Sequence, residues 1–247
     1  MRVVAIIQAR MGSSRLPGKV LLPLAGEPVL AHVIARVRAS GVLDDVVVAT
    51  STLPTDDVVA EVGAGEGARV FRGSEADVLS RYAGATLAFA ADVVVRITAD
   101  CPLIDPDILG EMVERFLAQL RQGSPIQVLT NSRIRSFPWG LDVEVFAREA
   151  LDTAAAEASA PRCREHVTTY FYENPDRFRI VDHVGYPDYS SYRLTLDTVE
   201  DYELLSQIAG AVPADELPKL RIGKIVDLLV KHPTWASINA HVQQTPA

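Results

Sequence analysis

The chain has 247 residues and a formal net charge of −8 at pH 7. An acidic chain argues against nucleic-acid binding, because phosphate backbones are held by basic surfaces. Its two cysteines are too few for a disulfide framework or a zinc knuckle, and no apolar stretch approaches the length of a membrane span. The sequence therefore indicates a cytoplasmic protein whose partners are neither nucleic acids nor membranes. Its length suits a single domain over residues 1–247.

Short apolar runs in the first half of the chain predict buried parallel strands, and helical patterns separate these runs. The strands are expected over residues 3–7, 46–49, a short stretch around 70, and 93–97. The helices are expected over residues 28–40, 56–62 and 77–90. Strands that alternate with helices form right-handed crossovers. We therefore expect a Rossmann-like α/β fold, in which a mostly parallel mixed sheet carries helices on both faces.

The second half of the chain opens with a well-marked helix start. Asp105 stands in the N-cap position and Pro106 in the first helical position, and the helix should continue to about Arg121. The pattern of residues 141–146 is typical of an antiparallel or edge strand. The mixed polar and aromatic residues 132–139 predict an excursion from the sheet. The remaining elements are expected to be helices over 149–158 and 163–173 and strands over 126–130, 178–182 and 192–196.

The strongest functional signal is the loop over residues 8–19, which directly follows the first strand. In open α/β sheets, ligands bind beyond the carboxyl ends of the strands. Gly12 and Gly18 permit backbone conformations in which N–H groups point at an anion. The side chains that suit phosphate groups are those of Arg10, Ser13, Ser14, Arg15 and Lys19. Residues 1–26 contain no Asp or Glu, so we interpret this segment as a phosphate-binding loop, with a flexible basic surface loop as the alternative.

Two better-known phosphate loops are excluded by their spacing. A Walker loop has the pattern G-x-x-x-x-G-K-S/T, whereas here five residues separate Gly12 from Gly18 and Val20 follows Lys19. The dinucleotide fingerprint G-x-G-x-x-G is absent as well. These differences disfavour an ATPase or a dehydrogenase.

Two aspartates, Asp100 and Asp197, come directly after later apolar strands. Hard divalent cations take oxygen ligands from one or two carboxylates together with substrate phosphates, so both are candidate magnesium ligands. The alternative for Asp100 is a helix cap, but Asp105 already fills that role. Thr198 and Asp201 have the spacing of a capping box, which leaves Asp197 without a structural task. The sequence alone does not show that the two aspartates meet.

Other polar residues have structural alternatives of similar weight. A segment that opens a helix after a strand suits recognition of the base and ribose, or equally a plain N-cap; its residues are Arg72, Ser74 and Asp77. His166 lies in a charged run that could serve the site, and a solvated helix face explains the run nearly as well as a functional role. Cys101 and Cys163 are interpreted as packing residues, because neither has a neighbouring base in the sequence.

Taken together, the motifs resemble those of a known enzyme family. In order over about residues 2–209 they are QARMGSSRLPGK, VATST, FRGSEADVLSRY, RITADCPLID, GLDVEVF, REHVTTYFYENP and RLTLDTVEDYELL. The chain resembles the cytidylyltransferases of the spore-coat polysaccharide biosynthesis type, which are similar to acylneuraminate and deoxy-octulosonate cytidylyltransferases. The resemblance implies a nucleotide-diphospho-sugar transferase fold, CTP as co-substrate and magnesium dependence. It also implies a homodimer built partly from an arm or insertion, which we expect around residues 132–175.

The resemblance implies roles for individual residues. The triphosphate would be held by Arg10, Ser13, Arg15 and Lys19. The backbone of Ala9 and Gly12 would lie close to the nucleotide. The nucleoside would be held by Ser74 and Asp77, and magnesium by Asp100 and Asp197. The positions near the acceptor pocket or the arm are Trp139, Asp142, Glu144 and His166. Sialate-activating relatives often have Pro where this chain has Gln8, which disfavours a nonulosonic acid as the acceptor.

The hypothesis for the activity is transfer of CMP from CTP to a sugar-type acceptor, an acidic or modified sugar of a surface polysaccharide, with release of pyrophosphate. Arg15 and Lys19 would stabilise the charge of the leaving group, while Asp100 and Asp197 hold the metal. The alternatives are a nucleotide-sugar-dependent glycosyltransferase, CMP transfer to a non-sugar acceptor such as a phosphonate, and nucleotide binding without catalysis. A glycosyltransferase would usually carry an Asp-x-Asp metal motif at a strand end; residues 105–107 have that spacing but begin a helix.

Overall fold

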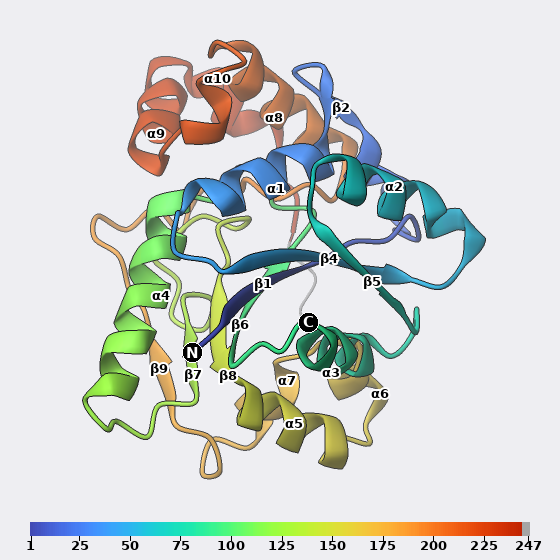
Figure 1. The fold of residues 1–247 in the computed structure, drawn as a ribbon. Coiled ribbons are helices and arrows are strands. Elements are labelled where there is room, and N and C mark those ends of the chain that lie inside the picture. Colours follow the sequence, from blue (N-terminus) through green and yellow to red (C-terminus); the bar gives the residue numbers. More distant parts are fainter. Residues whose placement is uncertain (244–247) are drawn as a thin grey trace.

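A seven-stranded mixed sheet forms the centre of the computed structural model, which describes residues 1–243 (Figure 1). Its strand order is β5-β4-β1-β6-β8-β7-β9. The strands are β1 (Val3–Gln8), β4 (Asp45–Ser51), β5 (Arg69–Gly73), β6 (Val93–Thr98), β7 (Val128–Thr130), β8 (Glu144–Ala147) and β9 (Ile180–Asp182). Neighbouring strands are parallel except where β8 pairs with β6 and β7. The predicted mostly parallel sheet is confirmed, with β8 as its antiparallel strand.

Helices cover both faces of the sheet, which explains why the central strands are continuously apolar. In β1, Ala5 and Ile7 pack into one core cluster, whereas Val4 and Ile6 pack into the other, because successive side chains of a strand point to opposite faces. The first face is covered by α1 (Val29–Ala39), α2 (Asp57–Gly65) and α4 (Pro106–Arg121), and the same core cluster extends to side chains of α8 (Val199–Gly210), α9 (Ile222–Lys231) and α10 (Pro233–Ile238). The second face is covered by α3 (Val78–Ala88), α5 (Arg148–Glu157), α6 (Pro161–Glu165) and α7 (Thr169–Glu173).

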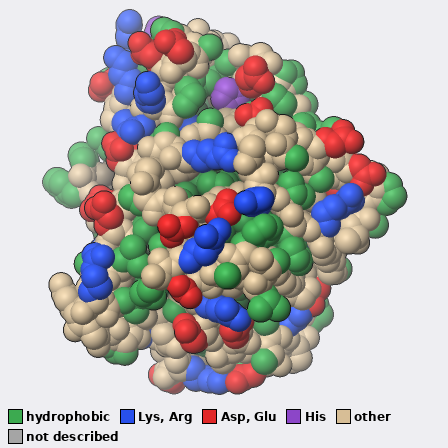
Figure 2. Space-filling model, in the orientation of Figure 1, with side chains coloured by type: hydrophobic (Ala, Val, Ile, Leu, Met, Phe, Trp, Pro, Cys, Tyr) green, Lys and Arg blue, Asp and Glu red, His purple; other side chains and the backbone are tan. Residues whose placement is uncertain are grey.

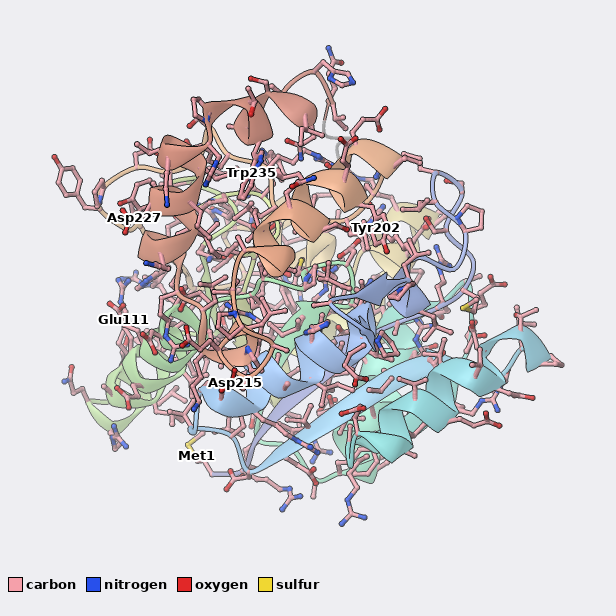
Figure 3. The ribbon with its side chains drawn as sticks, turned by 90° about the horizontal axis from the view of Figure 1, so that it is seen from above. Met1, Glu111, Tyr202, Asp215, Asp227 and Trp235 are labelled. Atoms are coloured by element: carbon pink, nitrogen blue, oxygen red, sulfur yellow. The ribbon has the colours of Figure 1, made fainter. Side chains whose placement is uncertain are left out.

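Several short elements complete the fold. They are the hairpin strands β2 (Pro23–Leu24) and β3 (Glu27–Pro28) and the 3-10 helices η1 (Lys19–Leu21), η2 (Pro54–Asp56) and η3 (Leu217–Lys219). Helices α8, α9 and α10 pack on one another beyond α1, and Figure 3 shows them from above, with Tyr202, Asp227 and Trp235 labelled. No helix among the described residues is long and apolar enough to cross a membrane.

The predicted helix starts are confirmed in atomic detail. The Asp105 carboxylate accepts hydrogen bonds from the backbone N–H groups of Asp107 and Ile108 at the start of α4, and α4 ends at Arg121 as expected. A reciprocal capping box of Thr198 and Asp201 begins α8. In both helices the cap satisfies backbone donors that have no partner within the helix.

Two predicted elements are wrong. The segment 192–196 is not a strand; only an isolated bridge joins Arg193 to Trp139, because its backbone bonds to separate loop residues one at a time. The single helix predicted over residues 163–173 is broken into α6 and α7, because His166 adopts an extended conformation with φ −106° and ψ 91°. Thr195 of the first segment and His166 between α6 and α7 both line a cleft at one end of the sheet.

The segment expected as an arm or insertion, residues 132–175, contributes strand β8 and helices α5, α6 and α7. Phe146 of β8, Leu151 of α5 and Phe171 of α7 are fully buried in the core of the second face. This part of the segment therefore belongs to the body of the fold, and its role in a dimer stays a prediction.

A buried arginine joins α1 to distant parts of the chain. Arg36 is fully buried, and its guanidinium donates hydrogen bonds to the backbone carbonyl groups of Leu103, Ile104, Leu217 and Leu220. Burial lowers its pKa to about 10, so the side chain is still charged at neutral pH. Arg36 thus ties α1 to the approach to α4 and to η3.

Arg36→Met is expected to lower the free energy of unfolding by about 3 kcal/mol or more, because buried carbonyl groups lose a charged donor. Urea unfolding followed by circular dichroism measures the change. Arg38→Met is the matched control, since Arg38 lies on the same helix and is exposed; its effect should stay within about 0.5 kcal/mol. Equal losses in the two variants would contradict the structural role of Arg36.

Candidate active site

Three segments that are distant in the sequence converge beyond the carboxyl ends of β1 and β6. These strands are parallel neighbours with Gln8 opposite Thr98, so the loop after β1 and Asp100 after β6 emerge side by side. The segment 192–197 joins them because the Leu196 N–H donates to the Asp100 carbonyl at 2.8 Å. The edge of the sheet where nucleotide ligands bind in open α/β folds is therefore where the predicted residues gather.

The loop over residues 9–18 is folded back on itself. The backbone N–H groups of Ser13 and Gly18 both donate to the Met11 carbonyl, at 2.9 and 3.1 Å. Gly18 has φ +70°, a left-handed conformation that favours glycine, and it places Lys19 at the start of η1. Gly12 does not have a positive φ; there a Cβ atom would lie 3.1 Å from the Glu75 carboxylate. Of the two glycines, only Gly18 therefore needs the freedom expected from the sequence.

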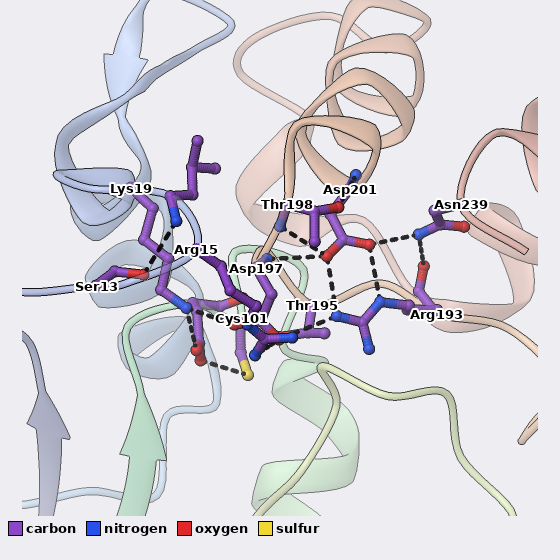
Figure 4. A network of polar contacts seen from close by, with 12 residues as sticks. Ser13, Arg15, Lys19, Cys101, Arg193, Thr195, Asp197, Thr198, Asp201 and Asn239 are labelled. Carbon is purple, nitrogen blue, oxygen red and sulfur yellow. Dashed lines mark hydrogen bonds and ion pairs between the residues drawn. The ribbon is translucent and has the colours of Figure 1, made fainter. Parts of the chain in front are cut away.

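The two candidate magnesium ligands meet around one ammonium group. Lys19 Nζ lies 2.7 Å from Asp100 Oδ2 and 2.7 Å from Asp197 Oδ1; Figure 4 labels Lys19 and Asp197. Burial alone would raise the pKa of Asp100, but Lys19 and a hydrogen bond from Thr98 outweigh burial, so this pKa is lowered. Burial would likewise lower the pKa of Lys19, and the two carboxylates raise it instead. Both carboxylates thus face one cationic position.

Asp197 is also held from its other side. Its Oδ2 atom lies 3.1 Å from Arg15 and 3.0 Å from Arg193. Arg193 forms a two-pronged ion pair with the fully buried Asp201, and the side chain of Asn239 donates to Asp201 at 2.8 Å and to the Arg193 carbonyl at 3.0 Å. The network in Figure 4 therefore connects Asp197, beyond the carboxyl ends of β1 and β6, with the residue that follows α10.

Sequence reasoning missed Arg193 and Asn239. A signal for Arg193 is present, because Arg193, Asp197 and Asp201 follow one another at intervals of four residues. Nothing local points to Asn239, which reaches the network only through the packing of the C-terminal helices.

The donor set fits a divalent cation that arrives with phosphate groups. Within residues 1–243, no three His, Cys, Asp or Glu side chains gather closely enough to form a metal cage made of protein alone. Mg²⁺ typically takes one or two carboxylates and completes its shell with phosphate oxygens and waters. Asp100 and Asp197 supply such a pair, and the Lys19 ammonium stands in for a cation between them.

A cleft of about 990 Å³ opens next to these aspartates. The predicted site residues that line it are Arg15, Asp100, Trp139, Asp142, Glu144, His166 and Asp197. A smaller cavity of about 110 Å³ is lined by Ala9 and Arg10 and shares Gln8, Glu165 and His166 with the cleft. The site thus has a large compartment and a small one, which meet at His166 and Gln8.

The far end of the cleft is built around a stacked arginine. The guanidinium carbon of Arg135 lies 3.1 Å from the centre of the Trp139 ring, and Arg135 donates to Asp142 at 2.9 Å. Gly140 makes this arrangement possible, because its φ is +96° and a Cβ atom would lie 2.5 Å from the backbone of Leu194. The Trp139 loop is thereby pressed against the segment that carries Asp197.

Titratable groups in the cleft have shifted pKa values. Burial raises the pKa of Asp142, and nearby Glu144 adds to this effect, although Arg135 opposes it. Glu144 is itself held by an ion pair with Arg96 and a hydrogen bond from the Tyr172 hydroxyl. Burial lowers the pKa of His166, which therefore remains neutral at pH 7.

The residues predicted for the nucleoside do not line either compartment. Arg72 donates to the carbonyl groups of Ser51 and Leu53. The Ser74 hydroxyl accepts from the Asp77 N–H, and Asp77 caps α3 and forms an ion pair with Arg164. These contacts match the capping alternative, although Asp77 directly precedes Val78, which lines the smaller cavity.

Two further predictions concern residues near the site. Cys101 lines the cleft beside Asp100, but burial raises the pKa of its thiol well above the ordinary value, in line with a packing role. The Asp-x-Asp pattern of residues 105–107 is not available to a metal. Asp105 caps α4 and also accepts from the Ile222 N–H, and Asp107 pairs with Arg221.

The basic loop is neutralised in three dimensions. Although residues 1–26 contain no acidic side chain, Arg10 pairs with Glu165 at 3.6 Å, and Arg15 and Lys19 pair with Asp197. Figure 2 shows acidic and basic side chains interspersed across the middle of the face in view. The local positive field expected from the sequence is therefore largely balanced by carboxylates from other segments.

Comparison with known proteins identifies the family. A model of the cytidylyltransferase family matches residues 4–227. The spore coat polysaccharide biosynthesis protein SpsF of Bacillus subtilis is 37% identical, over 95% of this chain and 97% of its own length. The structure of a cytidylyltransferase from Leptospira borgpetersenii is 36% identical, with a TM-score of 0.90 over 100% of both chains. CMP:2-keto-3-deoxy-manno-octonic acid synthetase, complexed with CTP, is similar in fold, with 19% identity and a TM-score of 0.64 over 86% of this chain and 100% of its own. The chain belongs to the cytidylyltransferase family.

Proposed function

We propose that this protein transfers CMP from CTP to a sugar-type acceptor, with release of pyrophosphate and with magnesium as the required cation. The observation that carries the proposal is the meeting of Asp100 and Asp197, from two separate segments, with Arg15 and Lys19 of the loop after β1. A triphosphate needs neutralising cations and a divalent metal in one place, and these side chains supply the protein's share of both.

In the proposed reaction, a hydroxyl oxygen of the acceptor forms a bond to the α-phosphorus while the opposite bond, to the oxygen of pyrophosphate, breaks; the hydroxyl proton passes to solvent. Arg10, Ser13, Arg15 and Lys19 contact the phosphate oxygens and stabilise the charge that develops on the leaving group. Asp100 and Asp197 hold the magnesium ion. When bound, the ion neutralises and orients phosphate oxygens. The chemistry requires positioning and charge stabilisation, and no covalent intermediate with the protein.

The two compartments suit the two substrates. The smaller cavity beside Ala9 and Arg10 is proposed for the nucleoside. Arg72, Ser74 and Asp77 precede α3, and we propose that they position the start of this helix, which forms part of the cavity wall. The larger cleft is proposed for the sugar-type acceptor substrate. The carboxylates of Asp142 and Glu144 would accept hydrogen bonds from its hydroxyl groups, and the rings of Trp139 and His166 also line the cleft, which suits a sugar.

A homodimer is also part of the proposal. Ile134, Val184 and Tyr186 are 54%, 53% and 98% exposed on two loops that are joined by a hydrogen bond from the Gly185 N–H to the Ser136 hydroxyl. Large apolar side chains on a joined pair of loops support association with a second copy. Sedimentation at several protein concentrations measures the mass; a monomer throughout would remove the dimer from the proposal.

Pyrophosphate release from CTP, ATP, GTP and UTP, each with a panel of acidic sugars, aminosugar derivatives and phosphonates, tests the reaction. We expect release with CTP and a sugar, and a loss of at least about 10²-fold after chelation of divalent cations, restored by added Mg²⁺. A phosphonate as the best acceptor would favour transfer to a non-sugar. Binding of CTP without release from any acceptor would contradict catalysis.

A further inference from the structure

The Lys19 ammonium occupies the space between the two aspartates. Its side chain is 11% exposed, and among the described residues Nζ forms hydrogen bonds only with Asp100 and Asp197. The other oxygen of each carboxylate is already engaged. Thr98 donates to Asp100 Oδ1 at 2.6 Å, and the Oδ2 atom of Asp197 faces Arg15 and Arg193. The carboxylate oxygens left for a shared metal are therefore Asp100 Oδ2 and Asp197 Oδ1, and Lys19 forms hydrogen bonds with both of them.

Within residues 1–243, the charges around Lys19 are matched in sign and number by protein groups. Three carboxylates, those of Asp100, Asp197 and Asp201, meet three cations in this part of the chain, those of Lys19, Arg15 and Arg193. A divalent cation between the aspartates would displace the ammonium and leave a buried positive charge without a partner. It would also face the two arginines. Both effects oppose binding of a free metal ion to the protein alone.

The Lys19 side chain can move away from the aspartate pair, whereas the Arg193 side chain is held in place. Lys19 carries its point charge on a flexible four-carbon stem that begins in η1. Arg193 is fixed by both oxygens of the buried Asp201, which Asn239 holds in turn. If Lys19 moves, Asp197 therefore keeps its orientation through Arg193.

We propose that Lys19 is the resident cation of the aspartate pair in the free protein, and that the triphosphate opens the pair to a divalent ion by drawing Lys19 onto its phosphate oxygens. This inference rests on the proposed function for the identity of the triphosphate. Metal and nucleotide then enter together, and each strengthens the binding of the other by the same factor. The free protein is protected from adventitious divalent cations.

Binding of Mn²⁺ without nucleotide, measured by electron paramagnetic resonance on the full chain, tests the exclusion directly. Lys19→Met should bind Mn²⁺ at least about tenfold more tightly than the unsubstituted protein, because the aspartate pair is vacated. Arg15→Met is the matched control: it removes a cation that contacts the same Asp197 but does not lie between the two aspartates. If Arg15→Met increases the affinity for Mn²⁺ less than Lys19→Met does, the effect of Lys19 comes from its position between the aspartates and not only from its positive charge. Equal effects in the two variants, or unchanged binding in Lys19→Met, would overturn the proposal.

A second measurement uses the unsubstituted protein and so does not depend on the folding of a variant. Mn²⁺ should broaden the backbone amide signals of Asp100 and Asp197 in nuclear magnetic resonance spectra when CTP is present, and far less at the same free Mn²⁺ concentration without it. Equal broadening in both states would overturn the proposal. If none of the four triphosphates binds, the proposed function fails, while the measurements without nucleotide still decide whether Lys19 excludes the ion.

Discussion

Asp100→Asn is expected to reduce pyrophosphate release by about 10³-fold, which is the scale of losing a major electrostatic contribution to a phosphoryl transition state. The asparagine keeps the shape of the side chain and can still accept from Thr98, but it loses the negative charge that faces Lys19. The fold should persist, because Lys19 retains Asp197 as a partner. Initial rates of pyrophosphate release, together with the thermal unfolding temperature, measure the two effects.

Asp107→Asn is the matched control for this substitution. Asp107 carries the same charge and lies close by in the sequence, but its side chain is 72% exposed and pairs with Arg221. We expect its rate to stay within about a factor of two of the unsubstituted rate, as for surface substitutions away from a site. A near-normal rate in Asp100→Asn would show that this carboxylate does not hold the metal.

Arg193→Met is expected to lower the free energy of unfolding by about 3–5 kcal/mol and to remove most of the activity. Burial alone would lower the pKa of Arg193, but Asp201 and Asp197 raise it, so the group is charged throughout the working range. Without its guanidinium, the fully buried Asp201 loses both of its strongest bonds and Asp197 loses the contact that orients it. Urea unfolding and rates of pyrophosphate release are the measurements.

Arg221→Met controls for the loss of an arginine from an ion pair. Arg221 pairs with the exposed Asp107, so its removal should cost no more than about 1 kcal/mol. If Arg193→Met is as mild as this control, the network behind Asp197 contributes little to stability.

The sequence predicted the elements whose signals are local. The buried strand over residues 3–7 was recognisable because both of its faces are covered, and the caps of Asp105 and Thr198 because capping depends on a few adjacent residues. The alternation of residues 192–196 imitates a strand. Its actual partners are Trp139 and Asp100, which lie far away in the sequence, and no local pattern reports them.

In the candidate site, too, features with a local signal could be predicted, whereas features that depend on distant segments could not. The pairing of Asp100 with Asp197 could be hypothesised, because each follows an extended apolar run and strand ends meet at one edge of a parallel sheet. The specific roles came from the family resemblance. The capture of Lys19 by both aspartates depends on contacts between segments far apart in the sequence, and a loop without an acidic residue of its own contains no pattern that predicts it.

The amide of Asn239 connects the end of α10 to the ion-pair network behind Asp197. A protein truncated before Asn239 would lose the hydrogen bonds that hold Arg193 and Asp201 in position, in addition to packing contacts. Fusion partners and affinity tags are therefore better attached at Met1, which lies near Asp92 at the amino ends of β1 and β6, away from this network.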